Sequence, residues 1–277
     1  MTVRGLRTGE RRPTTNGCPE PCVLLCGAVG LVLRLLPLSL ALAGCHLLFP
    51  LDGFDDGDSG AGGGTGGGNV PSCAGAFLCD GFESGLGNWT EKVTQFGGTV
   101  DADTAQANRG TRSLHSVTDW NNAGDESFAM VRDDRAVPLL FYARVFAYLP
   151  APAPQGAYAI IAVQESDGDY RGTSLGFQSG QLMLVNWGGM PDTVQVANGT
   201  FPTGKWVCLE WMLDSTQHET RVWQDGTELP ELHLTGLTTP AYNWFRLGLD
   251  VVGMPNVIYE LWLDDLYVGT QPVGCER

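Results

Sequence analysis

The feature that most constrains the fold of this chain is a series of short β-rich runs that recurs from Cys73 onward. In this part of the chain no apolar pattern with a period of about 3.6 residues extends beyond two turns, so helices are not expected. Pairs such as Asp167-Gly168 and Asp225-Gly226 place turns between the runs. The predicted strands are Ser113–Trp120, Leu139–Leu149, Tyr158–Glu165, Thr173–Phe177, Gln181–Trp187, Trp206–Leu213, Glu219–Trp223, Trp244–Val252 and Ile258–Val268. Many strands without intervening helices predict antiparallel sheets stacked as a sandwich.

Alternate residues of these runs predict which side chains face the core. Because successive side chains of a strand point to opposite faces, the apolar member of each alternating set should lie between the sheets. The sets assigned to the core are Ala159, Ile161 and Val163; Leu209, Trp211 and Leu213; and Phe245, Leu247 and Leu249. On this assignment Gln164, Glu210, Trp244 and Arg246 point outward. A slip of one residue in register would invert the assignment.

Four cysteines lie in the part of the chain that is expected to fold. Four cysteines allow three pairings, and the sequence alone does not choose between them. We expect Cys73 to pair with Cys79 and Cys208 to pair with Cys275. The second bond would close a loop of roughly 66 residues and stabilise the fold by about 4 kcal/mol. Disulfides of this kind indicate an oxidising compartment.

The N-terminal segment predicts export. An arginine-rich start precedes an apolar stretch, Val23–Ala43, which ends in Leu42-Ala43-Gly44-Cys45. This pattern is typical of a signal peptide over residues 1–44, and its last four residues resemble a bacterial lipobox, in which Cys45 receives the lipid. The alternative is a transmembrane helix, but Arg34 and Pro37 interrupt the stretch. We therefore expect an exported lipoprotein of the bacterial cell envelope, anchored in the outer membrane or at the cell surface.

A glycine-rich segment separates Cys45 from the β-rich part. The run from Asp52 to Gly68 contains nine Gly and four Asp in seventeen residues, which is too little apolar surface to fold. A flexible coil of this composition spans roughly 25–30 Å between Cys45 and Cys73. The expected organisation is a signal peptide over 1–44, a lipidated cysteine and tether over 45–72, and one β-sandwich domain over 73–277.

The net charge limits the partners of the chain. At −15 the chain is strongly acidic, which disfavours nucleic acid and anionic lipid headgroups. Membrane association should therefore depend on the covalent lipid anchor. The cation such a surface attracts is Ca²⁺, and Asp264 and Asp265 are the candidate ligands for a structural calcium ion, with Asp101 and Asp103 as a second pair. No other cofactor is expected.

Four segments together resemble the concanavalin A-like lectin/glucanase superfamily, which includes laminin-G-like modules and several polysaccharide lyases. They are Phe77–Glu83, Phe141–Phe146, Trp206–Trp211 with Arg221–Gly226, and Trp262–Val268. Cysteines near both ends are similar to those of secreted myxobacterial-type lipoproteins. The resemblance covers about Cys73 to Cys275 and implies an all-β, antiparallel, two-sheet jelly-roll sandwich.

The same resemblance implies that one sheet curves and holds carbohydrate on its concave face. Aromatic rings stack on the faces of sugar rings, while polar side chains pair with their hydroxyls. The candidate ligand-binding residues are Arg144, Gln164, Glu210, Trp223, Trp244 and Arg246. The alternative for each is an ordinary structural role, since many tryptophans are simply buried.

The sequence does not support catalysis of the kinds known in this superfamily. Its hydrolases carry closely alternating acidic residues on one strand, and the nearest match, Glu165–Asp169, runs into a glycine turn. The lyases of the superfamily carry a Gln-x-His pattern on one strand. Here Gln164 is followed by Glu165 and Ser166, so the histidine of that pattern is missing. We assign no catalytic residue and expect a surface-anchored lipoprotein that binds polysaccharide or another extracellular ligand. The alternatives are a polysaccharide lyase or hydrolase with atypical catalytic residues, and a structural envelope protein.

Overall fold

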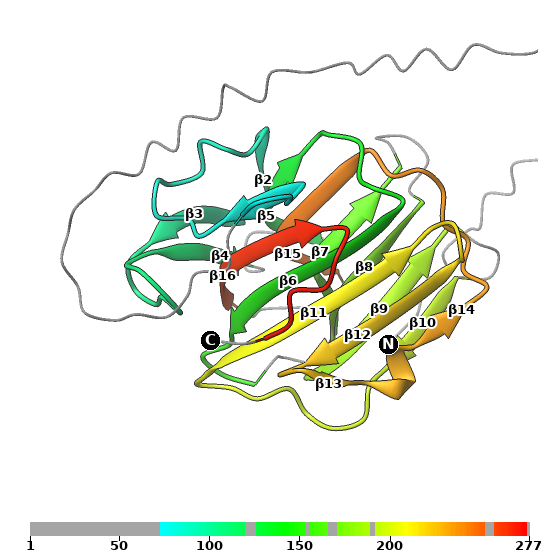
Figure 1. The fold of residues 1–277 in the computed structure, drawn as a ribbon. Helices are drawn as coiled ribbons and strands as arrows, with labels where there is room; N and C mark the ends of the chain where they lie inside the picture. The colour runs from blue at the N-terminus through cyan, green and yellow to red at the C-terminus, as the bar shows by residue number, and fades with distance from the viewer. Residues whose placement is uncertain are drawn as a thin grey trace, which may run out of the picture. The chain divides into compact units, whose positions relative to one another are not determined.

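The computed structural model describes residues 73–119, 126–152, 156–165, 171–188, 192–252 and 258–275. The expected signal peptide, Cys45 and the tether lie outside these residues. The described chain forms two antiparallel β-sheets and one 3-10 turn, η2 (Pro230–Leu232) (Figure 1). Among the described residues, no helix is long and apolar enough to cross a membrane.

The larger sheet, here called sheet A, faces the viewer in Figure 1. Its strands run in the order β13 (Thr227–Glu228), β12 (Glu219–Gln224), β11 (Trp206–Asp214), β6 (Leu140–Tyr148), β16 (Ile258–Gly269), β4 (Ser113–Asp119) and β3 (Thr99–Asp103). Two short strands extend it: β1 (Leu78–Asp80) pairs with β16, and β14 (Leu234–Thr235) pairs with β12. The first and last strands of the domain therefore lie side by side, with Leu78 opposite Val268.

The second sheet, here called sheet B, lies behind sheet A in Figure 1. Its strands run in the order β10 (Thr193–Val196), β9 (Gln181–Trp187), β8 (Gly172–Gln178), β7 (Ala157–Gln164), β15 (Trp244–Val252), β5 (Glu126–Asp133) and β2 (Glu91–Gln95). The two stacked sheets confirm the expected all-β, antiparallel jelly-roll sandwich.

All nine predicted strands are present, with ends that differ by one residue at most where the structure describes them. The strands that the sequence did not reveal are β1, β2, β3, β5, β10, β13 and β14. Most of these are short or lie at a sheet edge, and β2 and β10 expose most of their side chains. An edge strand with little apolar alternation gives a weak periodic signal, which explains the omission.

The core fills the space between the sheets with side chains from both layers. Trp211 and Phe141 come from sheet A, and Phe245 comes from sheet B; all three are fully buried. The Phe141 ring meets the Trp211 ring edge-on at 5.2 Å and the Phe245 ring edge-on at 6.4 Å. Edge-to-face contacts of this kind add about 0.5–1.5 kcal/mol each to the gain from burial. The contact between Phe141 and Phe245 joins the two layers, whereas Phe141 and Trp211 pack against each other within sheet A.

One core assignment from the sequence is wrong. Ala159 was expected between the sheets, but a β-bulge at Ile160 shifts the phase of β7, so that Tyr158 and Ile160 enter the core and Ala159 faces outward. From Ile161 onward the expected alternation holds, with Ile161 and Val163 in the core. A bulge adds one residue to a strand, and an argument from strict alternation cannot detect it.

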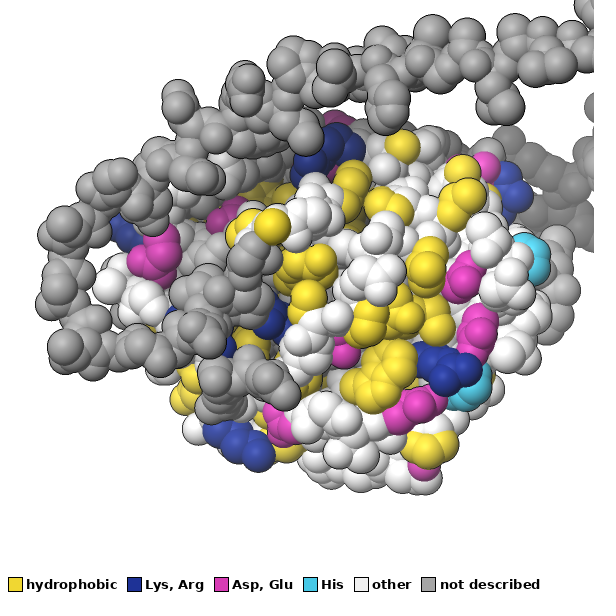
Figure 2. Space-filling view, viewed as in Figure 1, with side chains coloured by type: hydrophobic (Ala, Val, Ile, Leu, Met, Phe, Trp, Pro, Cys, Tyr) yellow, Lys and Arg dark blue, Asp and Glu magenta, His cyan; other side chains and the backbone are white. Residues whose placement is uncertain are grey.

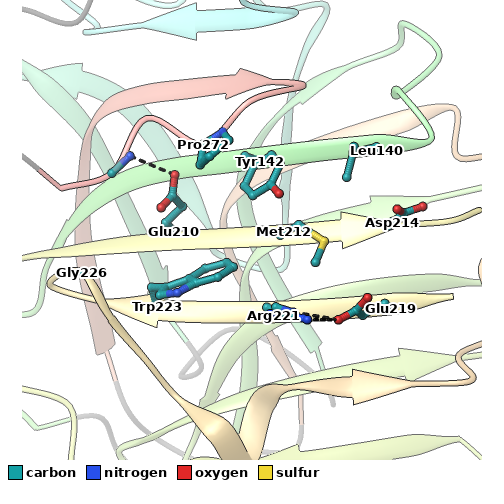
Figure 3. Close-up of a pocket in the computed structure, with 11 residues that line it drawn as sticks. Leu140, Tyr142, Glu210, Met212, Asp214, Glu219, Arg221, Trp223, Gly226 and Pro272 are labelled. Carbon is teal, nitrogen blue, oxygen red and sulfur yellow. Dashed lines mark hydrogen bonds and ion pairs between the residues drawn. The ribbon is translucent and has the colours of Figure 1, made fainter. Parts of the chain in front are cut away.

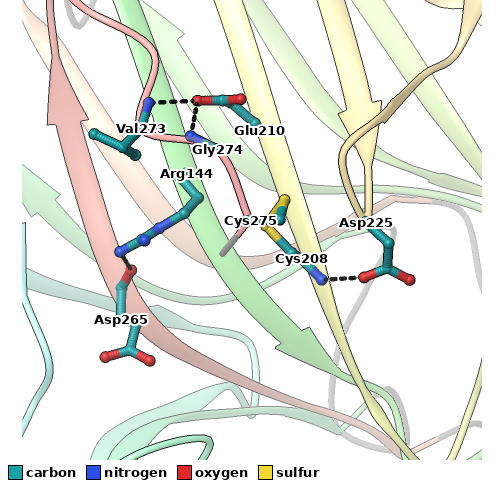
Figure 4. The surroundings of a disulfide bond; sticks show 8 residues. All are labelled: Arg144, Cys208, Glu210, Asp225, Asp265, Val273, Gly274 and Cys275. Atoms are coloured by element: carbon teal, nitrogen blue, oxygen red, sulfur yellow. Dashed lines mark hydrogen bonds between the residues drawn. A yellow bond between two sulfur atoms is a disulfide. The ribbon is translucent and has the colours of Figure 1, made fainter. Parts of the chain in front are cut away.

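Both expected disulfides are present. Cys73 is bonded to Cys79 beside β1, and Cys208 on β11 is bonded to Cys275. The second bond holds residues 270–275, here called the C-terminal strap, against sheet A after β16 has ended. Figure 4 shows the strap passing over β6 and β11.

Candidate ligand-binding pockets on the two outer faces

The six candidate ligand residues do not converge on one site. Arg144, Glu210 and Trp223 lie on β6, β11 and β12 of sheet A, whereas the others lie on sheet B. Glu210 stands directly opposite both Arg144 and Trp223 in the ladder. The resemblance implied one curved sheet as the carrier of all six candidates, but they are divided between the outer faces of the two sheets.

Sheet A carries a pocket of about 530 Å³ over β6, β11 and β12, here called the sheet A pocket (Figure 3). Its lining consists of Leu140, Tyr142, Glu210, Met212, Asp214, Glu219, Arg221, Trp223, Gly226, Pro272 and Gly274. The last two residues belong to the C-terminal strap, which forms one wall. Because every lining residue of the strands has its side chain on the outer face, the pocket follows from the period-two alternation of three neighbouring strands.

Aromatic side chains form the floor of this pocket. Tyr142 on β6 and Trp223 on β12 have ring centroids 6.5 Å apart and planes tilted by 32°. Both residues are half-buried, so part of each ring remains accessible. Met212 lies between them on β11, opposite Tyr142 in the ladder, and is buried. Figure 2 shows hydrophobic side chains gathered over the centre of this face, with charged side chains at one margin.

Charged side chains surround the aromatic floor. Glu210 is only 6% exposed, and its Oε1 accepts hydrogen bonds from the backbone N–H groups of Val273 and Gly274 in the strap, at 2.9 and 3.1 Å (Figure 4). Arg221 donates to Glu219 at 2.7 Å. Glu210 thus fastens the strap to the sheet, and Arg221 holds Glu219 at the far side of the pocket.

Two of these carboxylates are kept ionised by their surroundings. Burial acts to raise the pKa of Asp214, but hydrogen bonds from Thr216 and Gln217 outweigh it and lower that pKa below its usual value. The hydrogen bond from Arg221 is the main cause of the lowered pKa of Glu219, and His233 contributes a second bond at 2.8 Å. Neither carboxyl group is therefore poised to give up a proton near neutral pH.

Arg144 lies on the same face of sheet A as Glu210 and Tyr142, but other parts of the protein cover it. The residue is 2% exposed, and its Nη2 donates a hydrogen bond to the backbone carbonyl of Asp265 at 3.0 Å (Figure 4). Burial lowers the pKa of its guanidinium below the usual value, while the Asp265 and Glu210 charges oppose that shift. Arg144 is not part of the pocket lining in this structure.

The other three candidates lie on the outer face of sheet B. Arg246 stands directly opposite Arg132 of β5, and both guanidinium groups lie over the Trp244 ring, at 4.9 and 4.5 Å from its centroid. Trp244 is only 9% exposed, so its ring supports the arginines and offers little surface for a ligand. Gln164, opposite Trp244 in the ladder, is also buried.

A smaller pocket of about 210 Å³ lies beside these residues, here called the sheet B pocket. Its lining consists of Tyr158, Ala159, Ser174, Met183, Val185, Trp187 and Asp250. Small residues on β7 and β8 leave a depression, and Trp187 on β9 and Asp250 on β15 form its sides. None of the six candidate residues lines it.

The candidate calcium ligands are engaged by protein groups. Asp264 accepts hydrogen bonds from the backbone N–H groups of Asn108, Arg109 and Asp265, and Asp265 accepts one from the Asn108 side chain. Burial and the neighbouring Asp265 raise the pKa of Asp264 to about 7. Within the described ranges, no group of three or more His, Cys, Asp or Glu side chains is arranged to hold a metal ion. A structural Ca²⁺ at this pair remains a prediction.

The sequence missed several residues that form these pockets. Tyr142, Arg221 and Asp214 line the sheet A pocket, and Trp187 lines the sheet B pocket. Tyr142 and Arg221 lie in segments that also carry the superfamily resemblance, two residues from Arg144 and Trp223 respectively. Residues two apart on a strand point to the same face. The choice of Arg144 and Trp223 as candidates should therefore have led to Tyr142 and Arg221 as further candidates.

Comparisons with known proteins agree with the fold. No protein-family model and no curated protein matches the sequence. The structure is similar to that of the cellulose-induced protein Cip1, with 20% identity and a TM-score of 0.58 over 72% of this chain and 99% of that chain. It is also similar to an endo-β-1,4-glucuronan lyase from the fungus Trichoderma reesei, with 17% identity and a TM-score of 0.55 over 67% of this chain and 92% of that chain. The chain has the concanavalin A-like jelly-roll fold.

Proposed function

We propose that this domain binds an extracellular carbohydrate in the sheet A pocket without cleaving it. The observation that carries the proposal is the position of the Trp223 and Tyr142 rings beside Glu210, Asp214 and Arg221. Partly exposed rings offer flat apolar surface to the C–H face of a sugar, and the surrounding carboxylates and guanidinium pair with its hydroxyls. A pocket of about 530 Å³ lies within the usual range for small-ligand sites.

The similar structures support a carbohydrate ligand as the class to test first. One of them is a glucuronan lyase, an enzyme that acts on a polysaccharide. The fold alone does not assign the activity, because one fold hosts many functions. The ligand proposal therefore depends on the pocket itself.

The acid–base properties of the pocket support binding rather than hydrolysis. A glycosidase needs a carboxylic acid whose raised pKa keeps it protonated, beside a second carboxylate. Here the pKa values of Asp214 and Glu219 are lowered, and Glu210 uses one oxygen to hold the strap. The polysaccharide lyase or hydrolase with atypical catalytic residues remains the alternative, and new reducing or unsaturated ends during incubation with ligand would reveal it.

A pair of matched variants tests the site. Trp223→Ala removes the larger ring of the sheet A pocket, and Trp187→Ala makes the same change on the opposite face. On a glycan array the protein should retain a carbohydrate, Trp223→Ala should weaken its retention at least about tenfold, and Trp187→Ala should leave it unchanged. No retention of the protein on any glycan, or equal losses in both variants, would refute the proposal.

We further propose that the domain is exported and attached to the envelope through a lipid on Cys45, with residues 45–72 as a tether. The two disulfides support export, because such bonds form in oxidising compartments. Mass spectrometry of the protein from membranes should find a diacylglyceryl group on Cys45, and Cys45→Ala should release the protein from the membrane fraction. An unmodified Cys45 in membrane-bound protein would contradict the anchor.

A further inference from the structure

The charge of the sheet A pocket is strongly one-sided. Glu210, Asp214 and Glu219 line it together with Arg221 as the one cationic residue of the lining. Arg221 is already bound to Glu219 at 2.7 Å, so its charge is largely used within the protein. The carboxylates of Glu210 and Asp214 therefore set the sign of the electrostatic potential in the pocket.

Each of these carboxylates is fixed through one oxygen. In Glu210 the strap N–H groups bind Oε1, and in Asp214 the Thr216 and Gln217 donors bind Oδ1. No described residue donates a hydrogen bond to Glu210 Oε2 or to Asp214 Oδ2. Both oxygens belong to residues that line the pocket, and Glu210 is nine-tenths buried there. A carboxylate oxygen that lines a pocket and receives no donor from the protein is open to a ligand that brings one, especially a charged one.

The arrangement of the two aromatic rings indicates which kind of cationic ligand fits the sheet A pocket. The Tyr142 and Trp223 rings lie side by side with a 32° tilt, rather than facing each other across the space. Facing rings form a cage that surrounds one ammonium group, whereas neighbouring rings on one floor offer a platform to a flat, extended ligand. A pyranose ring that carries an ammonium group meets both demands, because its C–H face covers the rings while its charge reaches the carboxylates.

We infer that the ligand of the sheet A pocket is a cationic amino sugar chain, such as a polymer of β-linked glucosamine with free amino groups. The inference rests on the proposed function and names its ligand class. The sugar rings stack over Trp223 and Tyr142, and protonated amino groups donate to the free oxygens of Glu210 and Asp214. An uncharged polysaccharide could offer these oxygens only neutral hydroxyl donors, which form weaker hydrogen bonds than an ammonium group, and an acidic one would be repelled by the carboxylates.

A pair of ligands that differ only in charge tests the inference. Calorimetric titration at pH 6 uses a glucosamine pentamer and the same pentamer with every amino group acetylated. The free-amine pentamer should bind at least about tenfold more tightly, since a charge-assisted hydrogen bond is worth roughly 1.5–3 kcal/mol. Acetylation removes the charge but retains the ring faces, so the comparison isolates the electrostatic part.

Protein variants locate the binding. Glu210→Gln keeps an acceptor for Val273 and Gly274 but removes the charge, so it should weaken the free-amine pentamer about tenfold. Its melting temperature should fall as well, because the Glu210 charge also offsets the burial of Arg144. The acetylated pentamer should lose clearly less affinity in this variant than the free-amine pentamer does, because a hydrogen bond from a neutral donor is weaker than one from a charged donor. Ser174→Trp, which fills the sheet B pocket, is the control on the opposite face and should change neither affinity.

Each outcome separates the inference from the proposed function. Equal affinity for the two pentamers, both lost in Trp223→Ala, would overturn the cationic ligand but leave carbohydrate binding intact. Failure of both pentamers and of every other glycan would overturn both. A pentalysine peptide that binds as tightly as the free-amine pentamer and competes with it would also overturn the inference, because the pocket would then recognise a basic polypeptide.

Discussion

The two outer faces of the sandwich form pockets in opposite ways. On sheet B, small side chains on two central strands leave a depression between larger neighbours. On sheet A the floor consists of large side chains, and depth comes from an additional wall, the C-terminal strap. A flat or gently twisted sheet offers only a shallow surface by itself. Sheet B has a pocket because some of its outward side chains are small, and sheet A has one because the C-terminal strap lies along its face.

The difference extends to charge and to dependence on the rest of the fold. The sheet B pocket is bordered mainly by apolar and small side chains, whereas carboxylates dominate the sheet A pocket. The sheet A pocket also depends on a segment held by one disulfide and two backbone hydrogen bonds. Perturbations of that segment should therefore affect one face and leave the other intact.

The largest expected effect comes from removing the strap's covalent link. Cys208→Ser with Cys275→Ser opens a long loop and should lower the free energy of unfolding by about 4 kcal/mol. Carbohydrate binding in the sheet A pocket should weaken at least about tenfold because a wall is lost. Urea unfolding followed by tryptophan fluorescence measures the first effect and titration the second.

The control, Cys73→Ser with Cys79→Ser, opens a short loop and should lower stability by only about 2 kcal/mol, with unchanged affinity. Unaltered binding after loss of Cys208–Cys275 would show that the strap is not needed as a wall.

A second difference concerns the response to pH. The pKa of Asp264 on β16 of sheet A is raised to about 7 by burial and by Asp265. Between about pH 4 and pH 7 the folded protein therefore binds a proton that the unfolded chain releases, so this group's contribution is complete at the acidic end and is lost as pH rises to 7. The free energy of unfolding should fall by roughly 3 kcal/mol across that range through this group. Denaturation of Asp264→Asn should lack this component, and an identical pH profile for the variant would contradict the assignment.

A third test addresses the tight packing beneath the sheet B pocket. A Cβ at Gly176 would lie 1.9 Å from the backbone oxygen of Tyr158, next to the bulge of β7. Gly176→Ala should therefore destabilise the fold by about 2 kcal/mol, since backbone must move to relieve the overlap. Thermal unfolding compares it with Gly226→Ala, where the added Cβ meets nothing within 4 Å and only the positive φ of 79° is strained. That control should lose about 1 kcal/mol. Equal losses would indicate that the bulge region adapts more readily than the structure implies.

The smallest expected effect is the influence of salt on ligand binding. If carboxylates select the ligand, raising sodium chloride from about 0.05 to about 0.5 M should weaken the free-amine glucosamine pentamer several-fold by screening. The acetylated pentamer should change by less than about twofold over the same range. Calorimetric titration at each salt concentration provides the comparison. A parallel loss for both ligands would argue against an electrostatic contribution from Glu210 and Asp214.

The sequence predicted the layers of the molecule well and its sites less well. Central strands such as β15 alternate between core-facing apolar residues and outward residues that are mostly polar or small, and that pattern revealed their ends and their faces. Alternation is local, however, and does not report which sheet a strand joins. Glu210 and Arg246 were both correctly placed on outer faces, but topology puts those faces on opposite sides of the sandwich. The bulge that turned Ala159 outward belongs to the same class of information, because it depends on pairing with a distant strand.

The strap escaped prediction for a different reason. The disulfide partner of Cys208 was expected, but nothing in the sequence around Pro272 indicates that the segment forms a wall. The position of the strap depends on backbone N–H groups that donate to Glu210. Almost every residue type has such an N–H group, so the sequence does not show which ones form these bonds. Long-range contacts of this kind are set by the folded arrangement of β6, β11 and β16.

The bond between Cys208 and Cys275 joins the floor of the sheet A pocket to its wall. During biosynthesis, oxidation of this pair is therefore the same event as completion of the pocket. On the proposed function, formation of this bond in an oxidising compartment would raise the affinity of the pocket for its ligand.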